Sequence, residues 1–221
     1  MERKTYIITV AGGSGSRMGS DTPKQFLLLG GVPILQRTIE RFAEAVPDAK
    51  FITVLPSGHI RDWEDLCLKY CLNVPQIIVE GGLTRFHSVQ NALRKVPDGA
   101  VVAIQDGVRP LVSAPLIREM LSRMDKVRAL IPVVPVTDTL KNIDPAGPDP
   151  DRSGIVAAQT PQIFLSEDIK AAYTQGYSMS FTDDASVAKA YKIPLSYIEG
   201  ERNNIKITTP GDLAVAESRL R

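Results

Sequence analysis

The sequence of 221 residues contains little cysteine and histidine, and this excludes several kinds of protein. Its two cysteines, Cys67 and Cys71, lie four residues apart in a stretch with helical character, where a disulfide is geometrically unfavourable. Its two histidines, His59 and His87, are not spaced as ligands of one zinc ion, and neither has a neighbouring acid or nucleophile in a catalytic arrangement. We therefore expect reduced thiols in a cytoplasmic protein, and a chemistry that does not depend on histidine.

Long apolar runs and an excess of one charge are also missing. No apolar stretch approaches the ~18 residues of a membrane-spanning helix, and the N-terminal residues lack the pattern of a secretory signal peptide. The 26 lysines and arginines nearly balance 25 acidic residues, for a formal net charge of +1. A chain so balanced has no global field that attracts nucleic acid or a membrane surface. We expect small molecules or proteins as partners, with no nucleic acid and no membrane.

Short runs of β-branched residues alternate along the chain with segments of helical periodicity. The runs of strand length lie at 6–10, 51–55, 76–80, 100–105 and 129–136, and amphipathic helices are predicted at 33–45 and 88–96. This alternation predicts an α/β fold with a Rossmann-like, mostly parallel sheet flanked by helices, in a single domain spanning 1–221. Ligands of such sheets bind beyond the carboxyl ends of the strands, so we expect the loops after the first, third and fourth strands to share one site.

A glycine-rich loop with two spaced cations, Arg17 and Lys24, directly follows the first of these strands. Glycine lets backbone N–H groups approach and surround an anion, and the cations can neutralise its charge. The P-loop is excluded because no Gly-Lys pair occurs in the chain, and the dinucleotide fingerprint is excluded because Gly13, Gly15 and Gly19 have the wrong spacing. A purely structural turn is the alternative, which the two cations disfavour. The loop is therefore interpreted as a triphosphate cradle.

Seven sequence motifs, taken in order along the chain, resemble those of the sugar-phosphate cytidylyltransferases, especially the family that acts on 2-C-methyl-D-erythritol 4-phosphate. They begin with the glycine-rich loop up to Pro23-Lys-Gln-Phe26 and continue as Gly81-Gly-Leu-Thr-Arg-Phe-His-Ser-Val89, Asp106-Gly-Val-Arg-Pro110, Asp138-Thr-Leu-Lys141, Gln159-Thr-Pro-Gln162, Thr182-Asp-Asp-Ala185 and Asn204-Ile-Lys-Ile-Thr208. The resemblance covers nearly the whole chain. It implies Mg²⁺-dependent transfer of CMP from CTP to methylerythritol 4-phosphate, giving CDP-methylerythritol and pyrophosphate for isoprenoid-precursor synthesis by the non-mevalonate pathway.

Two other functions remain open from the residues. Ribitol-5-phosphate cytidylyltransferases resemble the chain in the same motifs and differ in a polyol that residue types cannot distinguish. A noncatalytic nucleotide-sensing module would use only the cradle. Retention of Lys24, Asp106, Arg152 and Lys206 together argues against the sensing module, which needs neither a metal ligand nor cations for an acceptor.

The reaction that the resemblance implies needs cations more than a general base. A phosphate monoester has a second pKa near ~6, so the attacking oxygen is already ionised at neutral pH. Catalysis then consists of alignment and charge neutralisation. The resemblance gives the catalytic roles to Arg17, Lys24, Arg152 and Lys206.

For the nucleotide, the resemblance implies a set of backbone and side-chain contacts around the glycine-rich turns. These are Ala11, Gly12, Gly13, Ser14, Gly15, Gly82, Ser88 and Asp106. Asp106, at the end of a strand, is also the implied Mg²⁺ ligand, although an aspartate in a turn before Gly107 is the alternative. Ser88 could equally be the N-cap of the helix at 88–96. Leu83, Gln105 and Gly107 depart from the family's pattern.

For the sugar or polyol phosphate, the resemblance implies binding by Arg109, Thr139, Arg152, Thr160, Thr182 and Lys206. Thr139 and Arg152 belong to a segment at about 137–160 whose stretch 141–153 holds three prolines and three aspartates, so we expect it to project from the domain. From its composition alone, this segment would be a flexible surface loop, and Arg152 an ordinary exposed arginine. The resemblance instead implies a β-arm that exchanges between the subunits of a homodimer and completes the partner's site.

Three further segments have the composition of helix starts. Ser166 and Thr209 are expected to cap the helices that follow them. Asp183 and Asp184 could form a second metal pair, but we favour acids in the first turn of a helix capped by Thr182.

Overall fold

A computed structural model of the protein describes residues 3–13 and 22–220. Its centre is one mixed sheet with the strand order β10-β7-β9-β6-β1-β4-β5, and β8 pairs with β7 alone. The strands are β1 (Thr5–Val10), β4 (Lys50–Leu55), β5 (Gln76–Glu80), β6 (Val101–Asp106), β7 (Ala129–Pro135), β8 (Val156–Ala158), β9 (Gln162–Leu165) and β10 (Ser196–Glu199). β1 runs parallel to β4 and to β6, whereas β9 lies antiparallel between β6 and β7. The predicted fold class, an α/β fold with a mostly parallel sheet, is confirmed.

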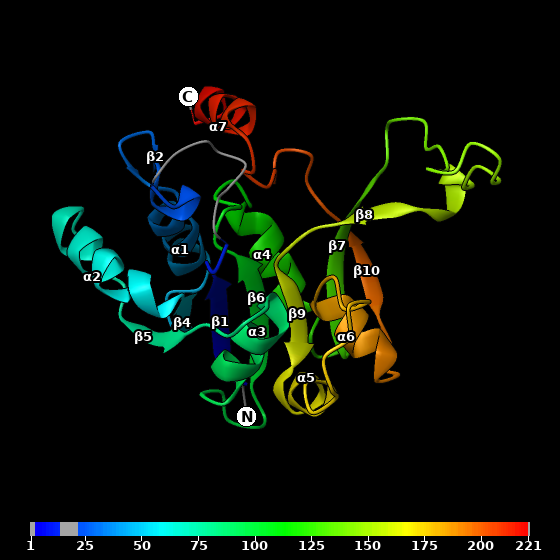
Figure 1. The fold of residues 1–221 in the computed structure, drawn as a ribbon. Coiled ribbons are helices and arrows are strands. Elements are labelled where there is room, and N and C mark those ends of the chain that lie inside the picture. The colour runs from blue at the N-terminus through cyan, green and yellow to red at the C-terminus, as the bar shows by residue number, and fades with distance from the viewer. Residues whose placement is uncertain (1–2, 14–21, 221) are drawn as a thin grey trace.

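Helices cover both faces of this sheet (Figure 1). One layer contains α1 (Ile34–Ala45), α2 (Ile60–Lys69) and α4 (Ala114–Ser122), and the other contains α3 (Arg85–Leu93), α5 (Ser166–Ala172) and α6 (Asp184–Ala190). The last helix, α7 (Pro210–Ser218), packs near the small hairpin of β2 (Leu28–Leu29) and β3 (Val32–Pro33). Short 3₁₀ turns lie at η2 (Lys24–Phe26), η3 (Ser57–His59) and η4 (Arg152–Gly154). Within the described ranges, no helix is long and apolar enough to cross a membrane.

Burial on both faces explains why the central strands are continuous apolar runs. Successive side chains of a strand point to opposite faces, so Ile7 packs with α1, α2 and α4, whereas Ile8 packs with α3, α5 and α6. Both are 0% exposed. The five predicted strands are present within one residue of their expected ends, but β9 and β10 were not predicted.

Three helix starts differ from the sequence-based expectation. The helix predicted at 88–96 begins earlier, at Arg85, because the Thr84 hydroxyl is its N-cap; the interpretation of Ser88 as N-cap is wrong. Asp183, not Thr182, caps α6 and forms a capping box with Ser186. Ser166 is the first residue of α5 instead of its cap. Thr209 caps α7 through a capping box, as predicted.

The chain between β7 and β9 projects from the body of the protein (Figure 1). β8 extends it as a short antiparallel ribbon in which Val133 pairs with Ala158 and Pro135 with Val156. Apolar side chains along it face solvent: Ile143 is 100% exposed and Val156 is 46% exposed. We call residues 136–158 the arm. Its apolar surface is not buried against the rest of this chain.

Candidate functional site

A pocket of about 260 Å³ opens at the carboxyl ends of β1 and β6, beside the turn that follows β5. The expectation that these three loops share one edge of the sheet is therefore confirmed. The edge lies where the chain order reverses between β1 and β6, the usual ligand position in open α/β sheets. The pocket is lined by Val10, Ala11, Gly12, Gly13, Lys24, Gln25, Gly82, Leu83, Thr84, Arg85, Ser88, Asp106, Val108 and Lys206.

The first wall of the pocket is the end of β1 with the start of the glycine-rich loop. The N–H of Ala11 donates to the carbonyl of Val54 at 2.9 Å, and the carbonyl of Ala11 accepts from the Gln25 amide at 2.9 Å. Lys24 is only 8% exposed, and a Cβ added at Gly13 would lie 3.6 Å from its Cε. The start of the glycine-rich loop and a shielded lysine side chain thus border one cavity, which is a suitable environment for phosphate. The predicted cradle residues Ser14, Gly15 and Arg17 lie outside the described residues.

The second wall is the turn from β5 into α3. The N–H of Gly82 donates to the Ser88 hydroxyl at 3.1 Å, and that hydroxyl donates to the Thr84 carbonyl at 3.0 Å. Space at this turn is tight, because a Cβ on Gly82 would meet the Cβ of His87 at 2.4 Å. Leu83 forms the rim and is 98% exposed. Ser88 therefore fixes the turn that borders the pocket.

The floor holds one carboxylate among three cations. Oδ2 of Asp106 lies 2.8 Å from Nζ of Lys206 and 3.7 Å from Nε of Arg109, and Oδ1 lies 3.5 Å from Nε of Arg85. Burial alone would raise the pKa of Asp106, but Arg85 and then Lys206 and Arg109 outweigh it and lower the pKa to about 2. Asp106 is therefore ionised at neutral pH, and positive charge remains in excess around it.

The lowered pKa of Asp106 predicts a specific acid dependence of stability. A folded-state pKa of about 2 against an ordinary 3.8 means that the contribution is complete above about pH 5 and is lost as the pH falls from there towards 2. Its size is roughly 2 kcal/mol of unfolding free energy. Urea titrations of the wild type and of Asp106→Asn between pH 7 and 2 should show this extra slope in the wild type alone. Parallel curves below pH 4 would contradict the assignment.

Three motifs that are distant in the sequence meet beside this carboxylate. Nη1 of Arg109 donates to the carbonyl of Asn204 at 2.7 Å, and the Asn204 amide donates to the carbonyl of Thr160 at 2.8 Å. The Thr160 hydroxyl in turn accepts from the N–H of Asp106 at 3.1 Å. The structure thus brings together Asp106, Arg109, Thr160 and Lys206, which the resemblance assigned to one site.

Gln105 and Gly107, which depart from the family's sequence pattern, each make a specific contact near the pocket. The Gln105 amide donates to the carbonyl of Arg109 at 3.0 Å. A Cβ on Gly107 would lie 2.9 Å from Leu35 Cδ1 and 3.1 Å from Ala11 Cβ, so the close packing behind the pocket requires glycine. Both residues support the turn that carries Asp106 and Arg109.

Of the six predicted acceptor residues, Lys206 lines the pocket, Arg109 and Thr160 lie behind it, and the other three lie away from it. Thr139 and Arg152 are exposed on the arm, where Nη1 of Arg152 donates to the carbonyl of Thr137 at 2.9 Å. Thr182 is exposed just before α6. Within one chain these three side chains do not meet Asp106 and Lys206 in the pocket.

Sequence reasoning assigned no role to Arg85, although its side chain lines the pocket. It makes a bidentate ion pair with Asp184, at 2.9 and 2.7 Å, and Asp184 is 0% exposed. Asp184 lies in the first turn of α6, as expected, but its carboxylate pairs with Arg85. The one available signal was an arginine in the Gly81-Gly-Leu-Thr-Arg motif.

The described residues contain no group of three histidines, cysteines or acids that could hold a metal ion on their own. Asp106 nevertheless supplies a carboxylate oxygen at the pocket. Mg²⁺ is commonly held by one or two carboxylates together with water and phosphate oxygens of the substrate. The donor set therefore fits a metal that is held jointly with a bound triphosphate.

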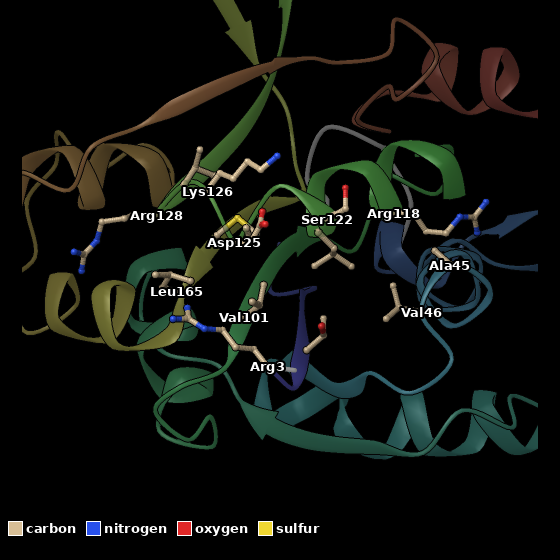
Figure 2. A pocket seen from close by; sticks show the side chains of 14 residues that line it. Arg3, Ala45, Val46, Val101, Arg118, Ser122, Asp125, Lys126, Arg128 and Leu165 are labelled. Carbon is tan, nitrogen blue, oxygen red and sulfur yellow. The ribbon is translucent and has the colours of Figure 1, made fainter. Parts of the chain in front are cut away.

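A larger cavity of about 740 Å³ lies at the opposite edge of the sheet, beside Thr5 and Val101 (Figure 2). Its cations include Arg3 and Arg128, which pair with Glu167 and Asp168. Figure 2 shows the Arg118 and Arg128 side chains extending to opposite sides of the cavity. It contains none of the predicted site residues, so size alone does not identify the functional pocket.

Comparisons with known proteins agree along the whole chain. A model of the 2-C-methyl-D-erythritol 4-phosphate cytidylyltransferase family matches residues 5–221. The enzyme of that name from Porphyromonas gingivalis W83 is 48% identical, with 100% of this chain and 99% of the relative covered. Its namesake from Bacteroides thetaiotaomicron is 44% identical over 98% of this chain and its own full length.

Solved structures give the same result. The crystal structure of 4-diphosphocytidyl-2C-methyl-D-erythritol synthase from Anaerococcus prevotii has a TM-score of 0.82 at 27% identity, covering 99% of this chain and 96% of that one. The Francisella tularensis 2-C-methyl-D-erythritol 4-phosphate cytidylyltransferase has a TM-score of 0.79 at 28% identity, with 98% and 99% covered.

Proposed function

Because the chain belongs to the 2-C-methyl-D-erythritol 4-phosphate cytidylyltransferase family, we propose that it transfers CMP from CTP to 2-C-methyl-D-erythritol 4-phosphate. An oxygen of the acceptor phosphate attacks the α-phosphorus of CTP, the bond from that phosphorus to the bridging oxygen breaks, and pyrophosphate leaves. The products are CDP-methylerythritol and pyrophosphate. The observation that carries the proposal is the 48% identity to the Porphyromonas gingivalis enzyme over the whole chain.

The charges in the pocket support a division of roles. Lys24, buried beside Gly13, stabilises the charge that develops on the triphosphate, and the loop residue Arg17 does the same. Lys206 has a side chain 42% exposed at the pocket, so its ammonium can leave Asp106 for the acceptor phosphate. Arg109 and Thr160 hold this second half of the site together.

Mg²⁺ is proposed as the metal, with Asp106 as its protein ligand. When bound, the ion withdraws charge from the triphosphate during displacement. The chain's own contribution is a carboxylate kept ionised by Arg85, Lys206 and Arg109.

A homodimer is proposed on the placement of the arm. Arg152 and Thr139 are exposed on it and do not line their own chain's pocket. The exposed Ile143, Ile155 and Val156 offer apolar surface for a second copy of the chain. An arm that exchanges between subunits would bring Arg152 to the partner's acceptor phosphate, for which a guanidinium fork is well suited.

Gly82→Ala tests whether the turn after β5 forms part of the nucleotide site. The added Cβ would overlap His87, and relieving such overpacking costs roughly 1–3 kcal/mol, so we expect CTP affinity to fall about tenfold. Calorimetric titration with CTP and Mg²⁺ measures this loss. Gly58→Ala is the matched control, because a Cβ there meets nothing within 4 Å. Equal affinities for the two variants would remove this turn from the site.

The acceptor is tested by pyrophosphate release from CTP with methylerythritol 4-phosphate or ribitol 5-phosphate supplied separately. Release with the first alone supports the proposed function. Release with ribitol 5-phosphate alone would establish the alternative polyol reaction. CTP binding without pyrophosphate release from either would favour a nucleotide sensor.

A reducing compartment such as the cytoplasm is proposed for the protein. Cys67 and Cys71 are free thiols, and burial raises the pKa of Cys67, which keeps it in the protonated form. Neither thiol is used by the proposed reaction.

A further inference from the structure

Arg85 is an arginine whose hydrogen-bonding capacity is largely taken up inside the protein. Nη1 and Nη2 donate to the two carboxylate oxygens of Asp184 at 2.9 and 2.7 Å, and Nε faces Oδ1 of Asp106 at 3.5 Å. Three of its five N–H groups are therefore directed at carboxylates. Although Arg85 lines the pocket, these three N–H groups are already paired with carboxylates and are not free to bind a phosphate.

Asp184 is itself fixed from a second side. The Tyr173 hydroxyl donates to its Oδ1 at 2.6 Å, and the side chain of Asp184 is fully buried at the start of α6. Tyr173 is 2% exposed and stacks on Phe86, the residue next to Arg85. A buried chain of contacts thus runs from Tyr173 through Asp184 and Arg85 to Asp106. It joins the C-terminal end of α5, outside the pocket, to the pocket floor.

The three cations around Asp106 differ in how firmly they are held. The Lys206 side chain is 42% exposed, lines the pocket and lies 2.8 Å from Oδ2. The Arg109 side chain is 13% exposed, lies 3.7 Å from Oδ2 and donates to the carbonyl of Asn204. If an acceptor phosphate engages Lys206, Oδ2 loses its nearest partner, whereas Arg85 keeps its place at Oδ1 through its attachment to buried Asp184.

We propose that Arg85, anchored by Asp184 and Tyr173, is a positioning residue that holds the Asp106 carboxylate towards the nucleotide pocket while Lys206 binds substrate. The inference rests on the proposed function, because it assumes that Asp106 receives the Mg²⁺ of CTP. Arg85 acts through Asp106 and touches neither substrate. Its bidentate geometry is essential, so lysine cannot replace it even though lysine keeps the charge.

Calorimetric titration of CTP at increasing Mg²⁺ tests this without turnover, since no acceptor is present. We expect Arg85→Lys and Asp184→Asn each to raise the half-saturating Mg²⁺ concentration about tenfold, as is usual when a partner of a metal ligand is lost. Tyr173→Phe, the mildest change, should raise it less. The double variant Arg85→Lys/Asp184→Asn should resemble Arg85→Lys, because Asp184 acts only through Arg85. In turnover, kcat should fall while KM for the acceptor changes little.

Ser186→Ala is the matched control, because it removes the capping box of α6 and leaves Asp184 intact. An equal change in Mg²⁺ dependence for Ser186→Ala at the same melting temperature would reduce Arg85 to a structural role and overturn the proposal. Additive effects in the double variant would also overturn it. If Arg85→Lys does not fold, the Mg²⁺ dependence of Tyr173→Phe and Asp184→Asn still tests the positioning role.

The variant Asp106→Asn separates the positioning role of Arg85 from the assignment of Asp106 as the Mg²⁺ ligand, on which that role rests. A changed Mg²⁺ dependence for Asp106→Asn with unchanged dependence for Arg85→Lys and Asp184→Asn would overturn the positioning role alone. An unchanged dependence for Asp106→Asn would overturn the metal assignment, and the positioning role with it.

Discussion

Replacing Lys24 with alanine is expected to lower kcat by about 10²–10³-fold, the usual loss when one preorganised charge-stabilising donor is removed. Lys24 is 8% exposed and lines the pocket beside Gly12 and Gly13, so its ammonium is shielded from solvent that could replace it. The additional negative charge on the leaving pyrophosphate develops during displacement and is absent when CTP first binds. For this reason kcat should fall more than CTP affinity does. Steady-state pyrophosphate release with saturating CTP and methylerythritol 4-phosphate measures the effect.

Lys69→Ala is the control for this experiment, because Lys69 is an exposed lysine on α2 outside the pocket. It should retain wild-type turnover. Melting temperatures of both variants show whether the fold is intact. A loss for Lys24→Ala that appears wholly in KM would mean that Lys24 only binds the nucleotide, and its catalytic assignment would fail.

Two inactive variants, Arg152→Ala and Lys24→Ala, are expected to restore activity when their subunits exchange. If the arm completes the partner's site, a mixed dimer has one site with both Lys24 and Arg152 and one site with neither. With random exchange, about one quarter of all sites become intact. Pyrophosphate release after co-refolding or long incubation of an equimolar mixture measures the recovery.

The matched mixture combines Lys24→Ala with Asp106→Asn, which line the same pocket of one chain. No mixed dimer of these variants has an intact site, so this mixture should stay inactive. Recovery in neither mixture, despite subunit exchange shown by mass spectrometry, would contradict a site shared between subunits. Arg152 would then be an ordinary exposed arginine of the arm.

Much of the fold was predictable because the central strands are buried on both faces. Burial of this kind leaves continuous β-branched runs such as those of β1 and β6, which the sequence displays directly. β9 was missed for a physical reason. It has four residues, and its pairing of Gln162 with Ile104 joins segments far apart in the chain, which no local pattern records.

The candidate site was predictable where a residue type and its position carry the chemistry. Lys24, Gly82, Ser88, Asp106 and Lys206 were all expected, and all line one pocket. Arg85 was missed because its partner Asp184 lies 99 positions away in the sequence. Ser88 was ambiguous because a hydroxyl before a helix and a hydroxyl beneath a glycine turn have the same local sequence, and only the structure distinguishes them.

The arm leaves the sheet and returns to it at a single point. Val133 pairs with Ala158, and the N–H of Gln159 donates to the carbonyl of Pro132 at 2.8 Å, so the two ends of the projecting chain are already joined. Doubling the length of such a closed segment costs only about 0.6 kcal/mol of conformational entropy. Evolution can therefore lengthen, shorten or rewrite the arm without disturbing the sheet. If the arm contributes to the acceptor site, as proposed, preference for one polyol phosphate over another can diverge there while the pocket at the carboxyl ends of β1 and β6 stays unchanged.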